Sequence, residues 1–189
     1  MITVTAETWL SSSSLDDTWA ALGRRDAYLC FPGVSPASNG GRSAPRGALR
    51  HELELPIVER QEQALRLSVS RKTAGSERHF AMRGPLVAIH GCWRLAPEPG
   101  GGVRATLTLD YDIGAALKEH AVNTLRSRSP LPIRTDADAI LSRAVDEFFE
   151  TRFAEHARDY CERVRARLDA SARAALELER DALGKRPRS

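Results

Sequence analysis

The hydrophobic pattern of the chain changes its period near residue 135. Before that point apolar and polar residues alternate, which is the period of half-buried β-strands. After it, apolar residues recur every three or four positions, as on one face of a helix. Residues 135–183 contain no Gly or Pro, and Thr135 or Asp136 can cap their start, so they predict one long helix. Its apolar stripe comprises Leu141, Val145, Phe149, Phe153, Ala157, Tyr160, Val164 and Leu168.

A run of strands lies between residues 47 and 113. The alternation is clear at 49–55, 65–69, 87–95 and 103–113, and a shorter strand is expected at 79–83. The sequence EPGGG separates the last two strands and predicts a hairpin turn. Strands with one apolar and one polar face form antiparallel sheets that are buried on one side. We therefore expect the long helix to lie across the apolar face of such a sheet.

The chain opens with a strand and two short helices. Residues 2–9 alternate like a strand, and Ser14 is expected to cap a helix that stops at Gly23. A second short helix or turn follows and ends at Gly33. Residues 35–46, rich in Ser, Pro and Gly, predict an exposed loop. With six or seven antiparallel strands and segregated helices, the fold class is α+β.

Composition limits the classes of function. The chain has 189 residues, of which 42% are hydrophobic and 28% charged, and this is typical of one soluble globular domain. No apolar run reaches the roughly 18 residues that a membrane span needs, and the N-terminus lacks the features of a signal peptide. The net charge of +3 is too small to indicate a nucleic-acid partner.

The cysteines and acidic pairs give no sign of a metal site. Cys30, Cys92 and Cys161 lie far apart and in no CxxC spacing, which argues against a disulfide framework or a zinc site and favours a reducing, cytoplasmic location. Asp110 and Asp112 share the outward face of a strand, but no third ligand accompanies them in the pattern. Phosphate-binding and hydrolase motifs are also missing from the sequence. We therefore expect neither a cofactor nor a metal.

Four stretches together carry a resemblance to a known family. They are ITVTAETWLSSSSLDDTWAAL, FPGV, GCWRLAPEPGGGVRATLTLDYDI and ILSRAVDEFFETRFAEHARDYCERV. In order they give a strand, a small helix with Trp19, a late hairpin with Trp93 and Leu95, and a terminal helix. This order, over residues 1–168, resembles the helix-grip fold of the START and birch-pollen-allergen superfamily. The resemblance is greatest to its polyketide cyclase and coenzyme-Q-binding branch.

The resemblance implies a curved sheet wrapped around the terminal helix, with a hydrophobic cavity between them. Members bind lipids, quinones, hormones or polyketides there, and some catalyse cyclisation or dehydration. It implies a ligand-binding domain at 1–170, followed by a helical overhang and basic tail at 171–189. Two features depart from the family pattern: a longer loop at 114–134, in which 115–126 can form a short helix, and the overhang itself.

Polar residues on the inward faces of the strands are the candidates for chemistry. His51 lies in register with apolar neighbours and can act as a base or as a hydrogen-bond donor to a ligand carbonyl; a paired core histidine is the simpler interpretation. Tyr111 can donate its hydroxyl proton to a developing enolate, although packing alone would also explain it. His79, His90 and Arg83 fall on the outward faces.

Further residues are expected to line or gate the cavity. Trp93 would shape its wall, Tyr28 and Phe31 would stand at its opening, and His156 would look into its mouth. The remaining expected lining residues are Thr8, Leu53, Leu109, Phe149 and Phe153.

Three hypotheses about function remain open at this point. The leading one is a cofactor-free enzyme of the polyketide cyclase type in secondary metabolism, with His51 as base and Tyr111 as oxyanion donor. The second is a non-catalytic carrier or sequestering protein for a lipid, quinone or related metabolite. The third is an interaction module whose overhanging helix forms a homodimer and which encloses no cavity.

Overall fold

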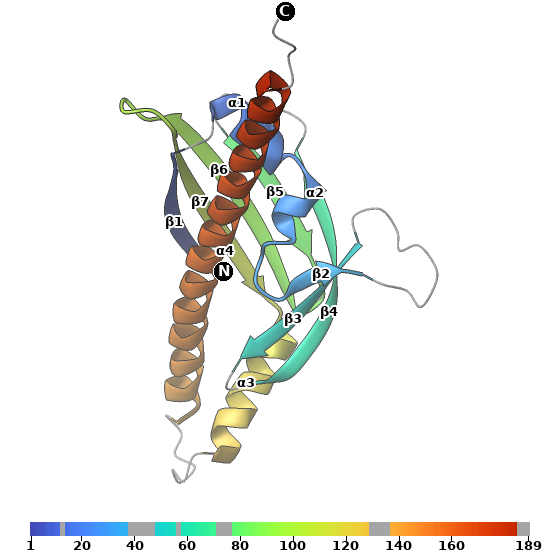
Figure 1. Cartoon of the computed structure of the whole chain (residues 1–189). Coiled ribbons are helices and arrows are strands. Elements are labelled where there is room, and N and C mark those ends of the chain that lie inside the picture. The colour runs from blue at the N-terminus through green and yellow to red at the C-terminus, as the bar shows by residue number, and fades with distance from the viewer. Residues whose placement is uncertain (12–13, 38–47, 56–57, 71–76, 129–136, 185–189) are drawn as a thin grey trace, which may run out of the picture.

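A curved sheet of seven antiparallel strands wraps around one long helix (Figure 1). The computed structural model describes residues 1–11, 14–37, 48–55, 58–70, 77–128 and 137–184. The strand order is β1-β7-β6-β5-β4-β3-β2, so the N-terminal strand and the short β2 form the two edges. The strands are β1 (Ile2–Leu10), β2 (Val34–Pro36), β3 (Ala48–Leu55), β4 (Val58–Val69), β5 (Glu77–Arg83), β6 (Val87–Pro97) and β7 (Val103–Ile113).

The terminal helix α4 (Ala137–Gly184) crosses the inner face of this sheet and packs chiefly against β1 (Figure 1). The predicted stripe is the buried side of the helix, except that Leu141 and Leu168 at its two ends are only half-buried. Burying such side chains contributes about 1.5–3 kcal/mol each, so this stripe fastens the helix to the sheet. Its buried members are Val145, Phe149, Phe153, Ala157, Tyr160 and Val164.

The strand alternation predicted from the sequence is confirmed in β6 and β7. Every second residue from Val87 to Leu95 and from Val103 to Ile113 is buried. The hairpin between the two strands uses Gly101 and Gly102, whose φ angles of 91° and 83° suit glycine. The α+β fold class and the seven-stranded curved sheet therefore agree with the sequence prediction.

Two short helices follow β1, as expected. In α1 (Leu15–Leu22) the Ser14 Oγ accepts a hydrogen bond of 3.1 Å from the Asp17 N–H, which confirms the predicted cap. Leu15 is exposed, and the buried residues of this helix are Thr18 and Leu22. The second helix, α2 (Arg25–Tyr28), is a single turn.

Two features differ from the sequence prediction. β4 starts at Val58 instead of residue 65, because Gln61 and Gln63 stand at inward positions and hide the alternation. β2 includes Ser35 and Pro36, which were expected to lie in a loop. The short helix expected at 115–126 is confirmed as α3 (Ala115–Arg128), which packs on α4.

A salt bridge of 2.7 Å between Lys118 and Asp146 joins α3 to α4, and Leu117 and Ala121 are buried. The predicted cap of α4 at Thr135 or Asp136 lies outside the described residues, as does most of the loop at 35–46.

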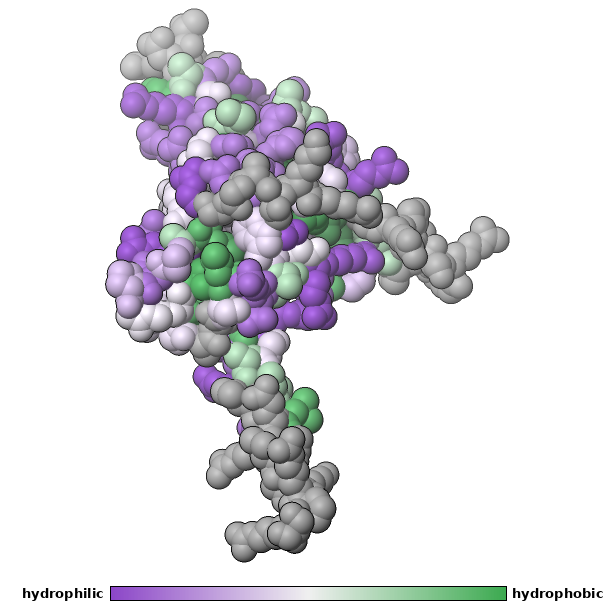
Figure 2. Space-filling model, turned by 90° about the horizontal axis from the view of Figure 1, so that it is seen from above, coloured by the Kyte–Doolittle hydropathy of each residue, from purple (hydrophilic) through white to green (hydrophobic). Residues whose placement is uncertain are grey.

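The visible face in Figure 2 is mostly hydrophilic, with smaller hydrophobic areas between the charged side chains. Among the helices described, none has a stretch that is both long and apolar enough to cross a membrane. The long helix α4 is instead charged along its solvent side, with ion pairs such as Arg163 with Asp159 at 2.7 Å.

Candidate ligand-binding site between the sheet and the terminal helix

The predicted lining residues meet in one buried interior between the sheet and α4. β3 supplies His51 and Leu53, β6 supplies Trp93, and β7 supplies Leu109 and Tyr111. Opposite them stand Phe149 and Phe153 of α4, with Tyr28 and Phe31 from the chain around α2. Each of these nine side chains is at most 1% exposed. Strand alternation and helical spacing therefore bring together residues as far apart in the chain as Tyr28 and Phe153.

Aromatic rings fill this interior in two series of contacts. In the first series Trp93, Tyr160, Phe31 and His51 follow one another with ring-centroid distances of 5.6, 5.1 and 6.1 Å. In the second, Tyr111 stacks on Phe153 at 4.0 Å with an angle of 5° between the ring planes. These rings occupy the space in which the family resemblance predicts a cavity.

The second series continues along α4. Phe149 lies 5.7 Å and His156 lies 6.1 Å from the ring of Phe153. His156 and His51 interact electrostatically, and this interaction helps to lower the pKa of His51.

Gln63 of β4 fixes the hydrogen-bonding state of His51. The Gln63 Oε1 accepts hydrogen bonds from the backbone N–H groups of Leu86 at 3.0 Å and Val87 at 3.2 Å. This assigns Nε2 as the donor end of the amide, and it lies 3.1 Å from the His51 Nδ1. The Nδ1 of His51 is then an acceptor, so the proton of the neutral ring sits on Nε2.

Burial controls the charge state of the titratable groups in this interior. Desolvation, with a further effect of His156, lowers the pKa of His51 from 6.5 to about 4, and the carbonyl of Pro32 opposes this only in part. Desolvation also raises the pKa values of Tyr111 and Tyr160 well above that of a free phenol. At neutral pH the histidine is therefore uncharged and both phenols keep their protons.

Four hydrogen-bond donors in this interior make no hydrogen bond of ordinary geometry with the described residues. They are the Nε2 of His51, the Nε1 of Trp93 and the hydroxyls of Tyr111 and Tyr160. Two weaker interactions remain: Trp93 interacts with the Tyr160 hydroxyl, and His51 interacts with the Pro32 carbonyl. Buried polar groups are nearly always hydrogen-bonded, and each unpaired one costs about 1–3 kcal/mol. Unpaired or weakly paired donors among aromatic rings can therefore bind the oxygen acceptors of a hydrophobic molecule.

His156 shares some of these properties. Its Nδ1 is buried without a partner among the described residues, and desolvation lowers its pKa. The side chain as a whole is half-buried. It stands at the edge of the ring cluster, beside Phe153, as the sequence predicted for a residue at the mouth.

Tyr28 has a structural hydrogen bond within this interior, and Thr8 lies outside it. The hydroxyl of Tyr28 donates to the Leu22 carbonyl at 2.7 Å, so it fastens α2 to α1 from within the core. Thr8 is half-buried and lines a hollow of about 340 Å³ with Glu7, Trp9, Glu98 and Arg104. The structure does not bring Thr8 together with the ring cluster.

Sequence reasoning missed two residues of the site. Tyr160 was recognised only as a member of the helical stripe, although it lies two turns after Phe153 and therefore faces the same interior. Gln63 was missed because its strand was predicted to begin after it. Its pairing opposite His51 in the β3–β4 register would have revealed the contact.

Comparison with solved structures identifies the fold. The Zhui aromatase/cyclase from Streptomyces sp. R1128 has a TM-score of 0.51 and 18% identity, with 92% of this chain and 96% of that chain covered. A conserved protein from Geobacillus kaustophilus has a TM-score of 0.52 and 11% identity, with 90% and 97% covered. A START superfamily protein from Mycobacterium smegmatis has a TM-score of 0.39 and 12% identity, with 82% and 96% covered.

The first two likenesses extend over nearly the whole chain and show that it has the same fold as these proteins. The helix-grip fold predicted from the sequence is thereby confirmed. No protein-family model matches the sequence, and no curated protein matches it.

Proposed function

We propose that this protein binds a hydrophobic small molecule with several carbonyl or phenolic oxygens between its sheet and α4. The observation that carries the proposal is a set of four buried donors, on His51, Trp93, Tyr111 and Tyr160, that make no hydrogen bond of ordinary geometry with the described residues. A polyketide or a quinone offers aromatic or planar carbon to the rings and oxygen acceptors to the donors. Entry of such a ligand requires the rings that now fill the interior to move apart.

We further propose that the protein acts on this ligand as an enzyme of the polyketide cyclase type. In an aldol ring closure an enolate carbon attacks a carbonyl carbon, and negative charge develops on oxygen. The hydroxyl of Tyr111 and the Nε2–H of His51 would donate to such oxygens, while the stacked rings exclude water. The bond from Gln63 to Nδ1 favours this donor role of His51 over the role of base that the sequence suggested.

The enzymatic proposal is tested with His51→Ala and Tyr111→Phe, each given a thioester-bound poly-carbonyl chain. We expect each variant to form the cyclised product at least about tenfold more slowly, because a preorganised donor is lost. His90→Ala, on the outer face of the sheet, is the control and should match the unchanged protein. Unchanged rates and product ratios in both site variants would refute these roles.

A non-catalytic carrier of a quinone or lipid is the second candidate. The composition of the interior favours this candidate, because its described groups are aromatic rings and hydrogen-bond donors. The His51 Nδ1, which would otherwise serve as a base, already accepts a hydrogen bond from Gln63. Native mass spectrometry of the protein from its own cells would reveal the bound molecule. Recovery of an unaltered quinone or lipid supports carriage, and recovery of a cyclised product supports catalysis.

The last part of α4 and the C-terminal tail lie beyond the buried stripe in the sequence. We propose that residues 1–170 form the ligand-binding domain and that 171–189 form the overhang and basic tail, which could provide a homodimer contact. We also propose a reducing, cytoplasmic location, in which the free thiols of the described cysteines would stay reduced.

A further inference from the structure

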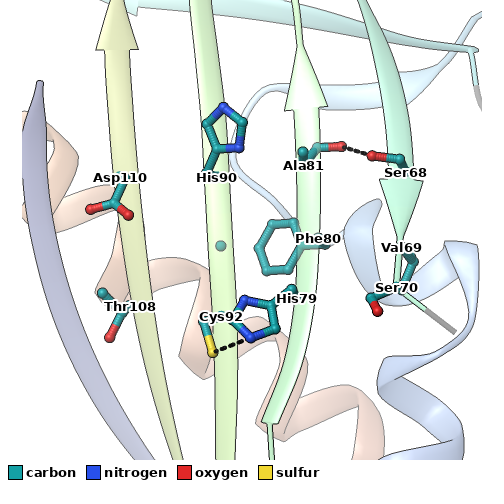
Figure 3. A pocket seen from close by; sticks show the side chains of 11 residues that line it. Ser68, Val69, Ser70, His79, Phe80, Ala81, His90, Cys92, Thr108 and Asp110 are labelled. Carbon is teal, nitrogen blue, oxygen red and sulfur yellow. Dashed lines mark hydrogen bonds between the residues drawn. The ribbon is translucent and has the colours of Figure 1, made fainter. Parts of the chain in front are cut away.

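The outer face of the sheet, away from α4, carries a groove that the ligand-binding proposal does not use. Its volume is about 460 Å³, and it runs across β4, β5, β6 and β7 (Figure 3). Its polar lining comes from the outward residues of these strands: Ser68, His79, His90, Cys92, Thr108 and Asp110.

Two of the residues that line this groove, His79 and Cys92, meet a third metal-ligating side chain, that of Glu77. Glu77 and His79 are alternate residues of β5 and so point to the same side, and His79 stands directly opposite Cys92 of β6 in the strand register. The His79 Nε2 lies 3.8 Å from the Cys92 Sγ and 3.4 Å from the Glu77 Oε2. Figure 3 marks the first of these contacts with a dashed line. One donor atom from each of the three residues lies within 4.8 Å of the other two.

These separations suit a tetrahedral metal ion. Zinc binds imidazole nitrogen and carboxylate oxygen at about 2.0–2.1 Å and thiolate sulfur at about 2.3 Å, which places neighbouring donors about 3.3–3.6 Å apart. The two shorter separations are within a few tenths of an ångström of that range. Small side-chain rotations would therefore complete the three-ligand geometry. The combination of sulfur, nitrogen and oxygen donors favours zinc and neighbouring transition metals over magnesium or calcium.

Arg94 holds the carboxylate ligand in place. Its Nε and Nη2 donate to the Glu77 Oε1 at 3.0 and 2.6 Å, so Oε2 is the atom turned toward His79. The same hydrogen bonds lower the pKa of Glu77, so the carboxyl is ionised at neutral pH. An outer partner that orients a ligand in this way is a usual feature of metal sites.

The cluster is also accessible. The side chain of His79 is 61% exposed and that of Glu77 is 32% exposed, while Cys92 is half-buried. An ion can therefore enter from solvent, and a water molecule or an external group can occupy the fourth position.

We propose that Glu77, His79 and Cys92 bind a divalent transition-metal ion of the zinc type on the outer face of the sheet. On binding, the Cys92 Sγ–H bond breaks, an Sγ–metal bond forms, and the proton passes to solvent. The site is independent of the interior between the sheet and α4.

Titration of the metal-free full-length protein with Co²⁺ tests this proposal, because a thiolate ligand gives a near-ultraviolet charge-transfer band. We expect one equivalent to saturate the band and Zn²⁺ to displace it. Cys92→Ser should abolish the band, and His79→Gln should weaken binding at least about tenfold. The matched controls are Cys30→Ser and His90→Ala, which change another free thiol and another histidine of the same face. Both should bind as the unchanged protein does.

The absence of a saturable band in the unchanged protein would overturn the proposal. An undiminished band in Cys92→Ser, or loss of the band in Cys30→Ser, would also overturn it. Circular dichroism of each variant, recorded before the titration, separates loss of a ligand from loss of the fold. Because Arg94 only orients Glu77, Arg94→Ala gives a further check: the band should remain while the affinity falls.

Discussion

At the scale of single residues, the unpaired hydroxyls of Tyr111 and Tyr160 give the clearest prediction. Removing a buried hydroxyl that makes no hydrogen bond removes a desolvation penalty. Tyr111→Phe and Tyr160→Phe should therefore leave the free energy of unfolding of the ligand-free protein unchanged or raise it by up to about 1 kcal/mol. Urea denaturation measures this, with Tyr28→Phe as the contrasting control because that hydroxyl bonds the Leu22 carbonyl. Destabilisation by both variants would mean that the hydroxyls are paired.

In contrast to the two tyrosines, Gln63 should stabilise the folded protein, because both ends of its side-chain amide are hydrogen-bonded. Gln63→Leu leaves the backbone N–H groups of Leu86 and Val87 without their acceptor and the His51 Nδ1 without its donor. We expect a loss of about 2–4 kcal/mol in the free energy of unfolding. Gln61→Leu, at a half-buried position two residues earlier, should cost less than about 1 kcal/mol. Equal effects of the two substitutions would contradict the assigned network.

His51 should make stability depend on pH in a defined direction. Its pKa is about 4 in the folded protein and 6.5 when unfolded, so its contribution is fully present above about pH 6.5. The contribution is lost as the pH falls toward 4, because the unfolded state then binds the proton more tightly. Between about pH 7 and pH 4.5 this loss is about 2 kcal/mol. Urea denaturation of His51→Asn across the same range should show a correspondingly smaller dependence; an equal dependence would contradict the assignment.

The sequence predicted which of these residues face inward but not what they do there. His51 and Tyr111 follow from alternation, since a strand turns every second residue to the same face. The donor role of His51 depends on Gln63, which joins it through the β3–β4 register, and on two backbone groups of a third strand. Such contacts are set by strand pairing, which no local pattern encodes.

At the scale of elements, α4 has two parts with different surroundings. Its middle carries the buried stripe from Val145 to Val164, whereas the described residues beyond Leu168 are exposed or half-buried. Near the boundary between the two parts, a salt bridge of 2.7 Å joins Arg167 of α4 to Asp26 of α2. This supports the proposed division of the chain near residue 170.

A chain that ends at Ala170 tests this division. It keeps the buried stripe and the Arg167–Asp26 salt bridge, so its free energy of unfolding should fall by less than about 1 kcal/mol. Urea denaturation gives this value, and sedimentation of both chains shows whether the overhang carries a homodimer contact. A loss of more than about 2 kcal/mol in a monomeric protein would place the overhang within the domain.

The helices and strands whose hydrophobic residues recur at a regular spacing were predicted correctly. Those without a regular spacing were missed or given the wrong start. The long helix and the β6–β7 hairpin have regular patterns and a Gly-rich turn, and the structure confirms both. β2 has only three residues, too few to show a period, and it exists because it pairs with β3. The early part of β4 is polar on both faces because Gln63 serves a hydrogen-bond network in the interior.

At the scale of the whole molecule, the sheet separates two candidate sites with different chemistry. Its inner face and α4 enclose aromatic rings and unpaired donors, while its outer face places Glu77, His79 and Cys92 at solvent. The outer cluster could not be read from the sequence, because thirteen positions separate His79 from Cys92 and only the β5–β6 register brings them together. The sequence alone had argued against a metal at these cysteines.

The central claim is that the interior selects hydrophobic ligands by their oxygen acceptors. The most direct test is equilibrium dialysis of the protein with a monohydroxylated anthraquinone and with anthracene, the matched hydrocarbon. We predict that the quinone binds at least about tenfold more tightly, which corresponds to about 1.4 kcal/mol of hydrogen bonding. We also predict that Tyr111→Phe combined with Tyr160→Phe removes most of this preference. Equal affinity for the two compounds, or a preference that survives the double substitution, would show that these hydroxyls do not bind the oxygens of the ligand.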